Sequence, residues 1–274
     1  MKSIVFVGGG NMASAIISGL LKQGLPANAL HVVEPSETQR AKLRQEFGVQ
    51  CLPNADAGLA DADLVVWAVK PQSFLAAAAP CGAILNNALH LSVMAGIRSD
   101  AIAQAVGTPR VVRAMPNTPA LIGQGIAALY AAPEVTAAER NWVQEVLAAT
   151  GATLWVEREA DLDAVTALSG SGPAYVFYFV EAMVQAAQEM GLSAEQGRAL
   201  ALATFAGATA LAQASPEPVS TLRERVTSKG GTTHAALLSL EANAVKAAIV
   251  VALKAAQQRA RELGDEFEQA ARSG

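Results

Sequence analysis

Short apolar runs alternate with helical patterns from the start of the chain to about Glu157. The early runs are apolar at nearly every position, which is typical of parallel strands buried on both faces. Capping-box spacings, in which Ser36 or Thr136 stands three residues before Gln or Glu, mark the starts of two intervening helices. The predicted strands are Ser3–Val7, Leu30–Val33, Leu64–Ala68, Leu89–Val93, Arg110–Met115, Gly125–Leu129 and Thr153–Val156. This alternation predicts a doubly wound α/β sheet.

The pattern changes near Arg158. From Glu159 onward the chain shows long helical segments rich in Ala, Leu and Glu, with almost no strand signal. We therefore predict two domains, a doubly wound sheet at residues 1–158 and an all-α domain at residues 159–274.

One segment of the helical half, Tyr175–Val180, is apolar or aromatic at every position. A helix that is apolar around its whole circumference must be buried on every side. A small helical domain offers little interior for such a helix, so we predict that it lies at an interface between subunits. The alternative is a central helix within a monomer.

Composition narrows the range of partners. The chain has 274 residues, is 52% hydrophobic and carries a formal net charge of −4 without a basic cluster, which argues against a nucleic-acid surface. Its two cysteines, Cys51 and Cys81, and its three histidines show neither a disulfide framework nor the spacing of metal ligands. We therefore expect reduced thiols, no metal and a small-molecule substrate.

Neither targeting nor membrane insertion is indicated. The first strand follows Met1-Lys2 directly and leaves no room for a signal peptide. The longest apolar stretches, at residues 199–214 and 242–256, are Ala-rich and fall short of the roughly 20 apolar residues of a membrane span. We expect a cytoplasmic protein with no membrane partner.

A glycine-rich turn follows the first predicted strand. Gly8, Gly10 and Ala13 match the spacing G-x-G-x-x-G/A, in which the first Gly permits the turn and the second lets a pyrophosphate approach. Asn11 and Met12 begin the next helix, whose N-terminus supplies free N–H groups to phosphates. The turn predicts a dinucleotide site in a Rossmann-like domain, with a purely structural turn as the alternative.

Glu34 ends the second predicted strand, where an acidic residue commonly holds the ribose hydroxyls of a dinucleotide. Its carboxylate favours NAD and repels a 2′-phosphate, whereas Ser36 and Arg40 could bind that phosphate. The choice between NADH and NADPH is therefore open from the residues alone. An ordinary solvated Glu34 is the alternative.

Further motifs stand at the ends of predicted strands, where ligands bind in open α/β sheets. They are Ala68-Val69-Lys70-Pro71, Met94-Ala95-Gly96 and Arg113-Ala114-Met115-Pro116-Asn117-Thr118-Pro119. Any one of them could be merely a well-formed turn. Three on one edge of the sheet favour a nicotinamide pocket.

The helical half carries two turns rich in Gly, Ser and Thr, at Ser169–Pro173 and Thr227–Thr233. The second turn places hydroxyls, backbone N–H groups and Lys229 directly before a predicted helix at His234–Leu240. Such a turn suits an anion such as a carboxylate. A glycine-rich linker between helices is the alternative.

These motifs occur in the order and spacing of pyrroline-5-carboxylate reductase, and the chain resembles that family along essentially its whole length. The motifs are Gly8-Gly9-Gly10-Asn11-Met12-Ala13, Ala68-Val69-Lys70-Pro71, Arg113-Ala114-Met115-Pro116-Asn117-Thr118-Pro119, Ser169-Gly170-Ser171-Gly172-Pro173-Ala174-Tyr175-Val176 and Thr227-Ser228-Lys229-Gly230-Gly231-Thr232-Thr233. The resemblance implies reduction of (S)-1-pyrroline-5-carboxylate to L-proline by NADPH or NADH, the final step of proline synthesis. It also implies an interleaved homodimer built on the helical domain, in many members assembled further into a decamer.

The resemblance also implies site residues. The cofactor would contact Gly8, Gly10, Asn11, Met12, Ala13, Glu34, Ser36, Asn54, Ala68, Val69, Lys70, Met115 and Asn117. The substrate carboxylate would bind the turn at Ser228, Gly230, Gly231 and Thr232, and the hydroxyl of Thr233 would contact the ring nitrogen as the catalytic group. In an oligomer of this kind, the partner chain can supply this turn.

Hydride transfer to a protonated imine relies on positioning more than on acid–base groups, which fits a sequence without an obvious catalytic His or carboxylate pair. His234 is a further candidate for a proton donor, and Lys229 would attract the substrate carboxylate. A β-hydroxyacid dehydrogenase has a similar layout but a catalytic lysine shortly after its second glycine-rich turn, and no lysine occurs here between Lys70 and Lys229. The remaining alternatives are a reductase of another cyclic imine and a non-catalytic dinucleotide-binding regulatory protein.

Overall fold

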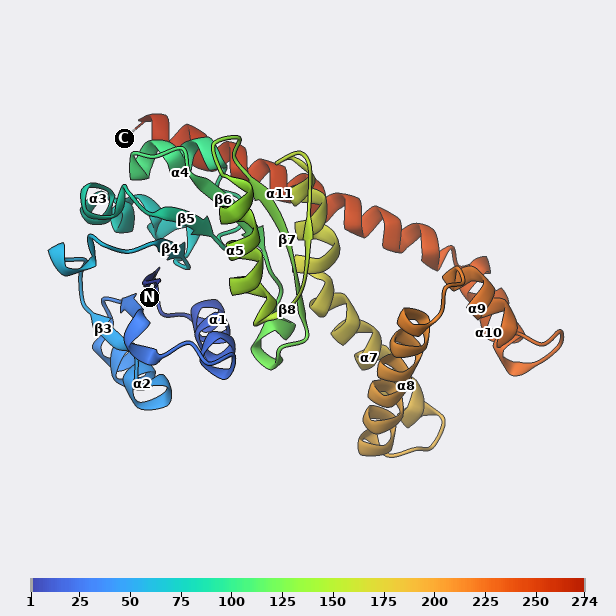
Figure 1. Cartoon of the computed structure of the whole chain (residues 1–274). Helices are drawn as coiled ribbons and strands as arrows, with labels where there is room; N and C mark the ends of the chain where they lie inside the picture. The colour runs from blue at the N-terminus through green and yellow to red at the C-terminus, as the bar shows by residue number, and fades with distance from the viewer. Residues whose placement is uncertain (1, 274) are drawn as a thin grey trace. The chain divides into compact units, whose positions relative to one another are not determined.

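The structure is a computed structural model that describes residues 2–273, with side chains to residue 270 (Figure 1). It divides into two compact units. One contains residues 2–171 together with 256–273, and the other contains residues 172–255.

The first unit is built on an eight-stranded sheet with the order β3-β2-β1-β4-β5-β6-β7-β8. All neighbouring strands are parallel except β6 and β7, which are antiparallel. The strands are β1 (Ile4–Val7), β2 (Leu30–Val33), β3 (Gln50–Leu52), β4 (Leu64–Trp67), β5 (Leu89–Ser92), β6 (Val111–Met115), β7 (Gly125–Ala131) and β8 (Gly151–Trp155). The predicted α/β fold class is confirmed, although β3 was not predicted because it is short and begins with an exposed Gln50.

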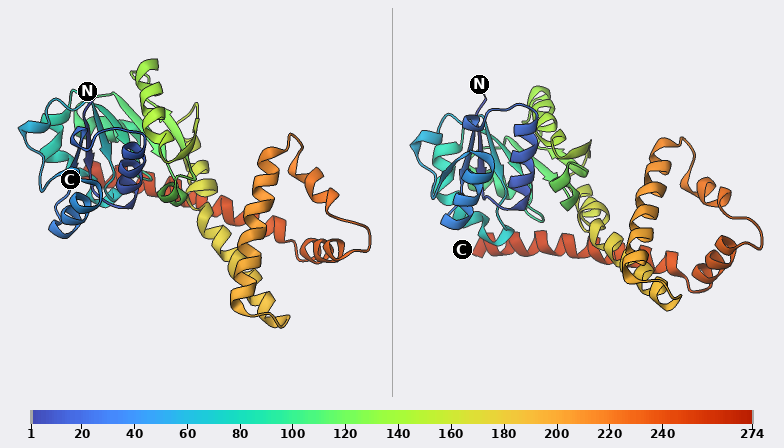
Figure 2. Two further views of the ribbon diagram at one scale, coloured as in Figure 1. Left: turned by 60° about the horizontal axis from the view of Figure 1, so that its bottom comes forward. Right: turned by 90° about the horizontal axis from the view of Figure 1, so that it is seen from below.

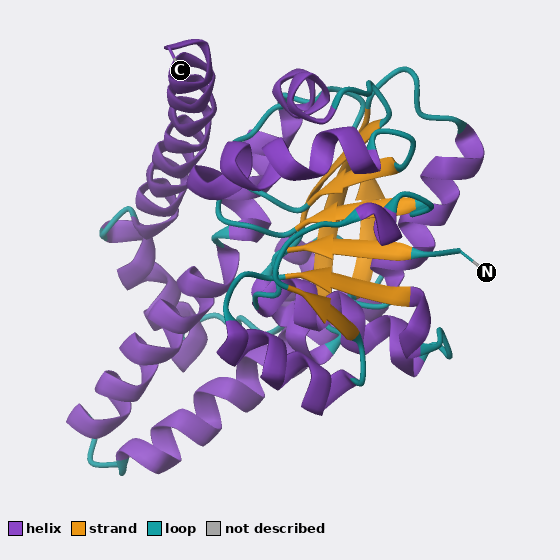
Figure 3. Ribbon diagram, turned by 90° about the vertical axis from the view of Figure 1, so that its left-hand side faces the viewer, coloured by secondary structure: helices purple, strands orange, loops and turns teal. Residues whose placement is uncertain are grey.

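Helices cover both faces of this sheet (Figure 3). They are α1 (Asn11–Lys22), α2 (Glu37–Phe47), α3 (Phe74–Leu85), α4 (Ser99–Val106), α5 (Ala137–Ala148), the short α6 (Asp161–Val165) and the end of α11 (Val245–Ser273). One buried cluster joins a face of the sheet to Ile16, Leu43 and Leu147 of α1, α2 and α5. The other joins the opposite face to Phe74 and Ile102 of α3 and α4. Because both faces are buried, the central strands are apolar along their whole length.

The sheet unit is formed by two parts of the sequence, one before and one after the residues of the helical unit. The ring of Phe267, near the end of α11, lies 6.2 Å from that of Phe74, and the Arg98 guanidinium binds the carboxylates of Asp265 and Glu268. These contacts place residues 256–273 with the sheet, and Glu159 is likewise held there by Arg113. The first compact unit thus ends at Ser171 and resumes at Ala256, and the domain boundary at residue 158 stays a prediction.

The second unit is all helical. It contains α7 (Gly172–Glu189), α8 (Ala194–Ala214), α9 (Val219–Arg225), α10 (Thr232–Ala242) and the first part of α11. Helices α7 and α8 lie side by side (Figure 2), and a Cβ on Gly197 would come within 2.7 Å of the Ala187 Cβ. Small residues at this contact let the two helices approach closely.

The predicted all-apolar segment lies in α7, but in the single chain it is largely exposed. The side chains of Phe177 and Tyr178 are 61% and 70% exposed. Contiguous exposed apolar surface of this kind is typical of a surface that a partner covers.

Within residues 2–273, no individual helix has both the length and the apolar character of a membrane span. The consecutive helices α10 and α11 meet that standard only when taken together, with a bend of 54° between them.

Candidate functional site

The glycine-rich turn joins β1 to α1 at the edge of the sheet where the parallel strands end. Gly8 has a φ of +97°, and a Cβ there would lie 2.7 Å from the carbonyl oxygen of Ala68, so both its conformation and its neighbour require glycine. Gly10 caps α1, and a Cβ on it would meet no described atom within 4 Å. The space above Gly10 is thus open to a ligand.

No side chain among the described residues caps the N-terminus of α1, which leaves the first backbone N–H groups of the helix available. These groups and the helix dipole favour a phosphate at this position. Ala13 is fully buried and packs the first turn of α1 onto the sheet.

A cavity of about 540 Å³ opens beside this turn. Seven of the predicted cofactor residues line it, namely Gly8, Gly10, Glu34, Asn54, Ala68, Val69 and Lys70. The other predicted cofactor residues, Asn11, Met12, Ala13, Ser36, Met115 and Asn117, are not part of its lining.

Sequence reasoning missed one wall of the cavity. It comes from α3 and the turn before it, and its residues are Ser73, Ala76, Ala77, Pro80 and Cys81. Their spacing of three and four places them on one face of a helix, a signal that the sequence does contain. Burial raises the pKa of the Cys81 thiol to about 11, so this wall presents a neutral thiol.

Glu34 and Gln39 hold the glycine-rich turn from the side of β2 and α2. The Gly9 N–H donates to Glu34 Oε2 at 2.9 Å, and Gln39 Nε2 donates to the Gly9 carbonyl at 2.5 Å. The Ser36 N–H donates to Glu34 Oε1 at 2.9 Å. Both oxygens of this carboxylate therefore have backbone donors.

Arg40, on α2, is buried. Its guanidinium donates to the carbonyls of Glu34 and Pro35 at 2.6 and 2.7 Å and pairs with the Glu37 carboxylate. The positive charge of Arg40 is thus neutralised by groups of the protein itself.

The end of β6 forms a second region of the predicted cofactor site. The Asn117 side chain accepts from the Ile126 N–H at 3.0 Å and donates to the Ser169 carbonyl at 3.2 Å, so both ends of the amide engage the protein. A Cβ on Gly170 would lie 2.5 Å from Met115 Cε, which shows how tightly the Ser169–Gly172 turn packs against this strand end. Thr166–Gly170 forms a π-helical turn, a feature frequent at functional sites.

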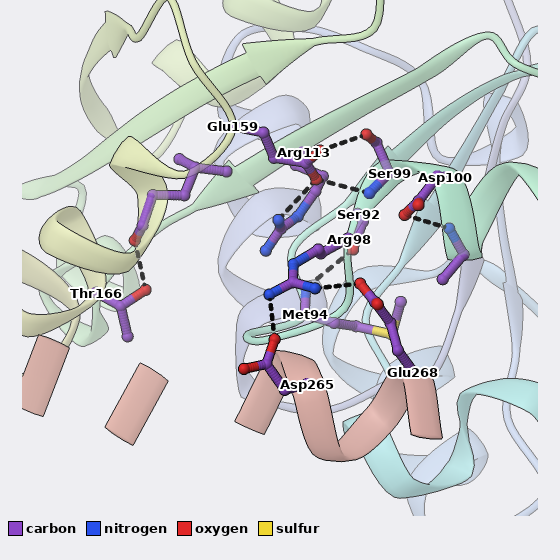
Figure 4. Close-up of polar contacts among 12 residues, drawn as sticks. Ser92, Met94, Arg98, Ser99, Asp100, Arg113, Glu159, Thr166, Asp265 and Glu268 are labelled. Carbon is purple, nitrogen blue, oxygen red and sulfur yellow. Dashed lines mark hydrogen bonds and ion pairs between the residues drawn. The ribbon is translucent and has the colours of Figure 1, made fainter. Parts of the chain in front are cut away.

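A polar network of Arg113, Ser99 and Glu159 holds the end of β6 (Figure 4). Glu159 Oε1 accepts from Arg113 Nη1 at 2.8 Å and from the Ser99 N–H at 2.6 Å, while Oε2 accepts from the Ser99 hydroxyl at 2.7 Å. The side chain of Arg113 is only 8% exposed, so Glu159 supplies the counter-charge for a buried cation.

The predicted substrate turn lies in the helical unit. Gly230 has a φ of +74°, and the Gly231 N–H donates to the Ser228 carbonyl at 3.0 Å to close the turn. Helix α10 then begins at Thr232, with no side-chain cap among the described residues. Ser228, Lys229 and Thr232 are exposed, whereas Thr233 and His234 are half-buried.

An uncapped helix of this length, preceded by a glycine-rich turn and a lysine, attracts an anion. The turn at residues 228–231 thus has features that suit an anion, and its role as the substrate carboxylate site stays a prediction. Among the described residues, no three His, Cys, Asp or Glu side chains gather in a way that could hold a metal ion.

The sheet and its cavity define a Rossmann-like, dinucleotide-dependent oxidoreductase with a helical second unit. A family model described as pyrroline-5-carboxylate reductase dimerisation matches residues 159–263, and one described as NADP oxidoreductase coenzyme F420-dependent matches residues 3–96. The chain belongs to the pyrroline-5-carboxylate reductase family.

Full-length relatives support this assignment. The chain is 44% identical to the pyrroline-5-carboxylate reductase of Pseudomonas aeruginosa over 97% of its own length and 98% of the relative's. It is similar to the structure of the Coxiella burnetii enzyme, with a TM-score of 0.89, 35% identity and coverage of 96% and 98% of the two chains. It is also similar to the Plasmodium falciparum enzyme solved with NADP bound, with a TM-score of 0.85, 29% identity and coverage of 96% and 98%.

Proposed function

We propose that this protein reduces the C=N bond of (S)-1-pyrroline-5-carboxylate to L-proline with NAD(P)H, the last step of proline biosynthesis. The observation that carries the proposal is the presence of two complementary sites in one family member: a dinucleotide cavity and a glycine-rich anion turn. A dinucleotide supplies the hydride, and the turn selects a carboxylate.

The sheet unit binds and orients the cofactor. The N–H groups at the start of α1 hold the pyrophosphate, and Glu34 with the α3 wall lines the adenosine side. Met115 and Asn117, at the end of β6, border the nicotinamide. When bound, the nicotinamide supplies the hydride at its C4 position.

The helical unit binds the substrate. Backbone N–H groups and hydroxyls at Ser228, Gly230, Gly231 and Thr232 hold the carboxylate, and Lys229 adds electrostatic attraction. The Thr233 hydroxyl orients the ring nitrogen, which as an iminium is already a strong electrophile. Catalysis then comes mainly from holding the imine carbon and the hydride donor in line.

The protein acts as a homo-oligomer in the cytoplasm. A dimer that covers the exposed apolar side chains of α7, including Phe177 and Tyr178, is the basic assembly. A decamer built from such dimers is the larger assembly that the family resemblance allows. Within this oligomer, the substrate turn is supplied in trans by the partner chain.

A direct assay tests the proposal. Purified full-length protein is mixed with pyrroline-5-carboxylate and NADH or NADPH, and loss of reduced-nicotinamide absorbance is matched to proline formed. The same protein is offered 1-pyrroline, which lacks the carboxylate, and a six-membered imine carboxylate. We expect pyrroline-5-carboxylate to be strongly preferred over both. Absence of turnover with either cofactor, in folded and oligomeric protein, would favour a regulatory role, and preference for the six-membered ring would identify another imine reductase.

A further inference from the structure

We infer that this protein is selective for NADH over NADPH and that Glu34 sets this selectivity, because its carboxylate occupies the place that a 2′-phosphate would need. The inference rests on the proposed binding of a nicotinamide dinucleotide in the cavity beside Gly8 and Gly10.

Glu34 already uses two backbone donors at the end of β2. Its oxygens accept from the N–H groups of Gly9 and Ser36, each at 2.9 Å. Backbone N–H groups in such a turn are the usual ligands of a phosphate. A 2′-phosphate at this position would have to displace the carboxylate or share its donors.

The fold holds Glu34 in this position. A Cβ on Gly9 would lie 2.6 Å from Leu43 Cδ1 and 3.4 Å from Glu34 Cγ, so only glycine lets the side chain come this close to the turn. Gln39 fixes the same peptide group from its carbonyl side. Residues of the glycine-rich turn, of the end of β2 and of α2 thus all contribute to the contact between Glu34 and the turn.

Arg40 and Ser36 are the residues that could have offset the repulsion between Glu34 and a 2′-phosphate. The Arg40 side chain is only 10% exposed, and its terminal nitrogens bind two carbonyl oxygens and the Glu37 carboxylate. The Ser36 hydroxyl caps α2 by accepting from the Gln39 N–H. Arg40 therefore presents no free positive charge to a phosphate, and Ser36 offers only a neutral hydroxyl.

Lys70, the cation in the cavity lining, belongs to another part of the cavity. Lys70 follows β4, and β1 separates β4 from β2 in the sheet. Two strand spacings correspond to about 10 Å. Lys70 therefore follows a strand about two strand spacings from the one that ends at Glu34, and this separation weakens its attraction for a phosphate beside Glu34.

The ribose hydroxyls of NADH can donate to the Glu34 carboxylate, whereas the 2′-phosphate of NADPH brings a second negative group against it. Repulsion between charges at contact distance near a protein surface is enough for discrimination of about tenfold to a hundredfold. The contacts of Glu34 and Arg40 therefore favour NADH where the sequence left the choice of coenzyme open.

Two measurements on the full-length wild-type protein test the selectivity. The first is the dissociation constant of each coenzyme alone, followed by nicotinamide fluorescence, and the second is kcat/KM for each with pyrroline-5-carboxylate. We expect both to favour NADH by about tenfold or more. Equal values, or a preference for NADPH in the binding measurement, would overturn the inference.

The variant Glu34→Gln tests the residue, since it removes the charge and keeps the shape. We expect the ratio of the affinity for NADH to the affinity for NADPH to fall by about tenfold, mainly because NADPH binds more tightly. The matched control is Glu46→Gln on α2, an exposed carboxylate outside the cavity lining, which should leave the ratio unchanged. An unchanged ratio in Glu34→Gln would refute the assignment.

The two proposals fail separately. Protein that binds NADH selectively but does not reduce pyrroline-5-carboxylate would contradict the proposed function and support the selectivity. Protein that reduces the substrate with a preference for NADPH would do the reverse. If Glu34→Gln unfolds in a thermal scan, the wild-type binding ratio still decides the inference.

Discussion

Two buried rings at the centre of the sheet unit illustrate how single residues tune its stability. Trp67 Nε1 donates to His90 Nδ1 at 2.9 Å, and the two rings are stacked. His90 Nε2 lies 3.1 Å from the Leu85 carbonyl, so it carries the proton and donates. Both ring nitrogens are thereby satisfied in the neutral form, and burial lowers the His90 pKa from 6.5 to about 4.

This arrangement predicts a loss of stability in mild acid. The unfolded chain binds a proton at His90 below about pH 6.5 and the folded protein only below about pH 4, so the stabilisation is complete above 6.5 and falls as the pH drops toward 4. We expect the free energy of unfolding, from urea titrations, to decrease by about 2 kcal/mol between about pH 7.5 and about pH 5. His90→Phe should remove most of this dependence, whereas His31→Gln should retain it. An equal pH dependence in wild type and His90→Phe would contradict the assignment.

A second prediction at this scale concerns Thr233. Replacing it with Ala removes the hydroxyl proposed to orient the ring nitrogen, so we expect kcat to fall by about tenfold or more while the dissociation constant of NADH stays nearly unchanged. Thr209→Ala is the matched control, because the Thr209 hydroxyl donates to the Phe205 carbonyl of its own helix at 2.7 Å. If Thr233→Ala weakened NADH binding and kept normal turnover, the assignment of Thr233 to the substrate site would be wrong.

At the scale of elements, the end of β6 depends on a contact with a segment 46 residues away in sequence. Glu159 neutralises Arg113 of β6 and also binds Ser99, the first residue of α4. The Arg113 Nε has no hydrogen-bond partner among the described residues, so this guanidinium relies heavily on Glu159. The strand that ends at Met115, a predicted cofactor residue, is therefore held by the Glu159 carboxylate in addition to its sheet neighbours.

Removing that carboxylate should be costly. Glu159→Gln leaves the Arg113 charge buried without its partner, and we expect a loss of about 2–4 kcal/mol in the free energy of unfolding. The control Glu157→Gln changes an exposed carboxylate two residues earlier and should alter stability by less than about 0.5 kcal/mol. Equal stabilities of the two variants in urea titrations would show that the network contributes little.

At the scale of the whole molecule, the helical unit exposes apolar side chains along several helices. They include Phe177, Tyr178, Leu200, Leu211 and Val219. A stable protein–protein interface buries about 1,200–2,000 Å² in total, and such residues supply much of its apolar core. This surface supports the assembly of the chain into an oligomer.

Charge introduced into this surface should break the assembly. We expect the wild-type protein to have at least the mass of a dimer by size-exclusion chromatography with light scattering, and Phe177→Glu to shift it toward the monomer. Leu154→Glu, at an exposed apolar position of the edge strand β8, is the control and should keep the wild-type mass. A monomeric wild type, or a Phe177→Glu variant of unchanged mass, would contradict the proposed interface.

The sequence by itself determined the doubly wound sheet, the glycine-rich turn at Gly8 and the helical second half, because hydrophobic periodicity and glycine spacing are written into contiguous residues. It also supplied family motifs that pointed to the substrate. Only the tertiary structure decided how β3 joins the edge, why residues 256–273 belong to the sheet unit, and that α3 forms a wall of the cavity. It likewise decided that Glu34 reaches the Gly9 N–H while Arg40 is withdrawn from the cavity. These features depend on contacts between segments that are distant in sequence. Packing and burial determine such contacts, and local sequence pattern does not.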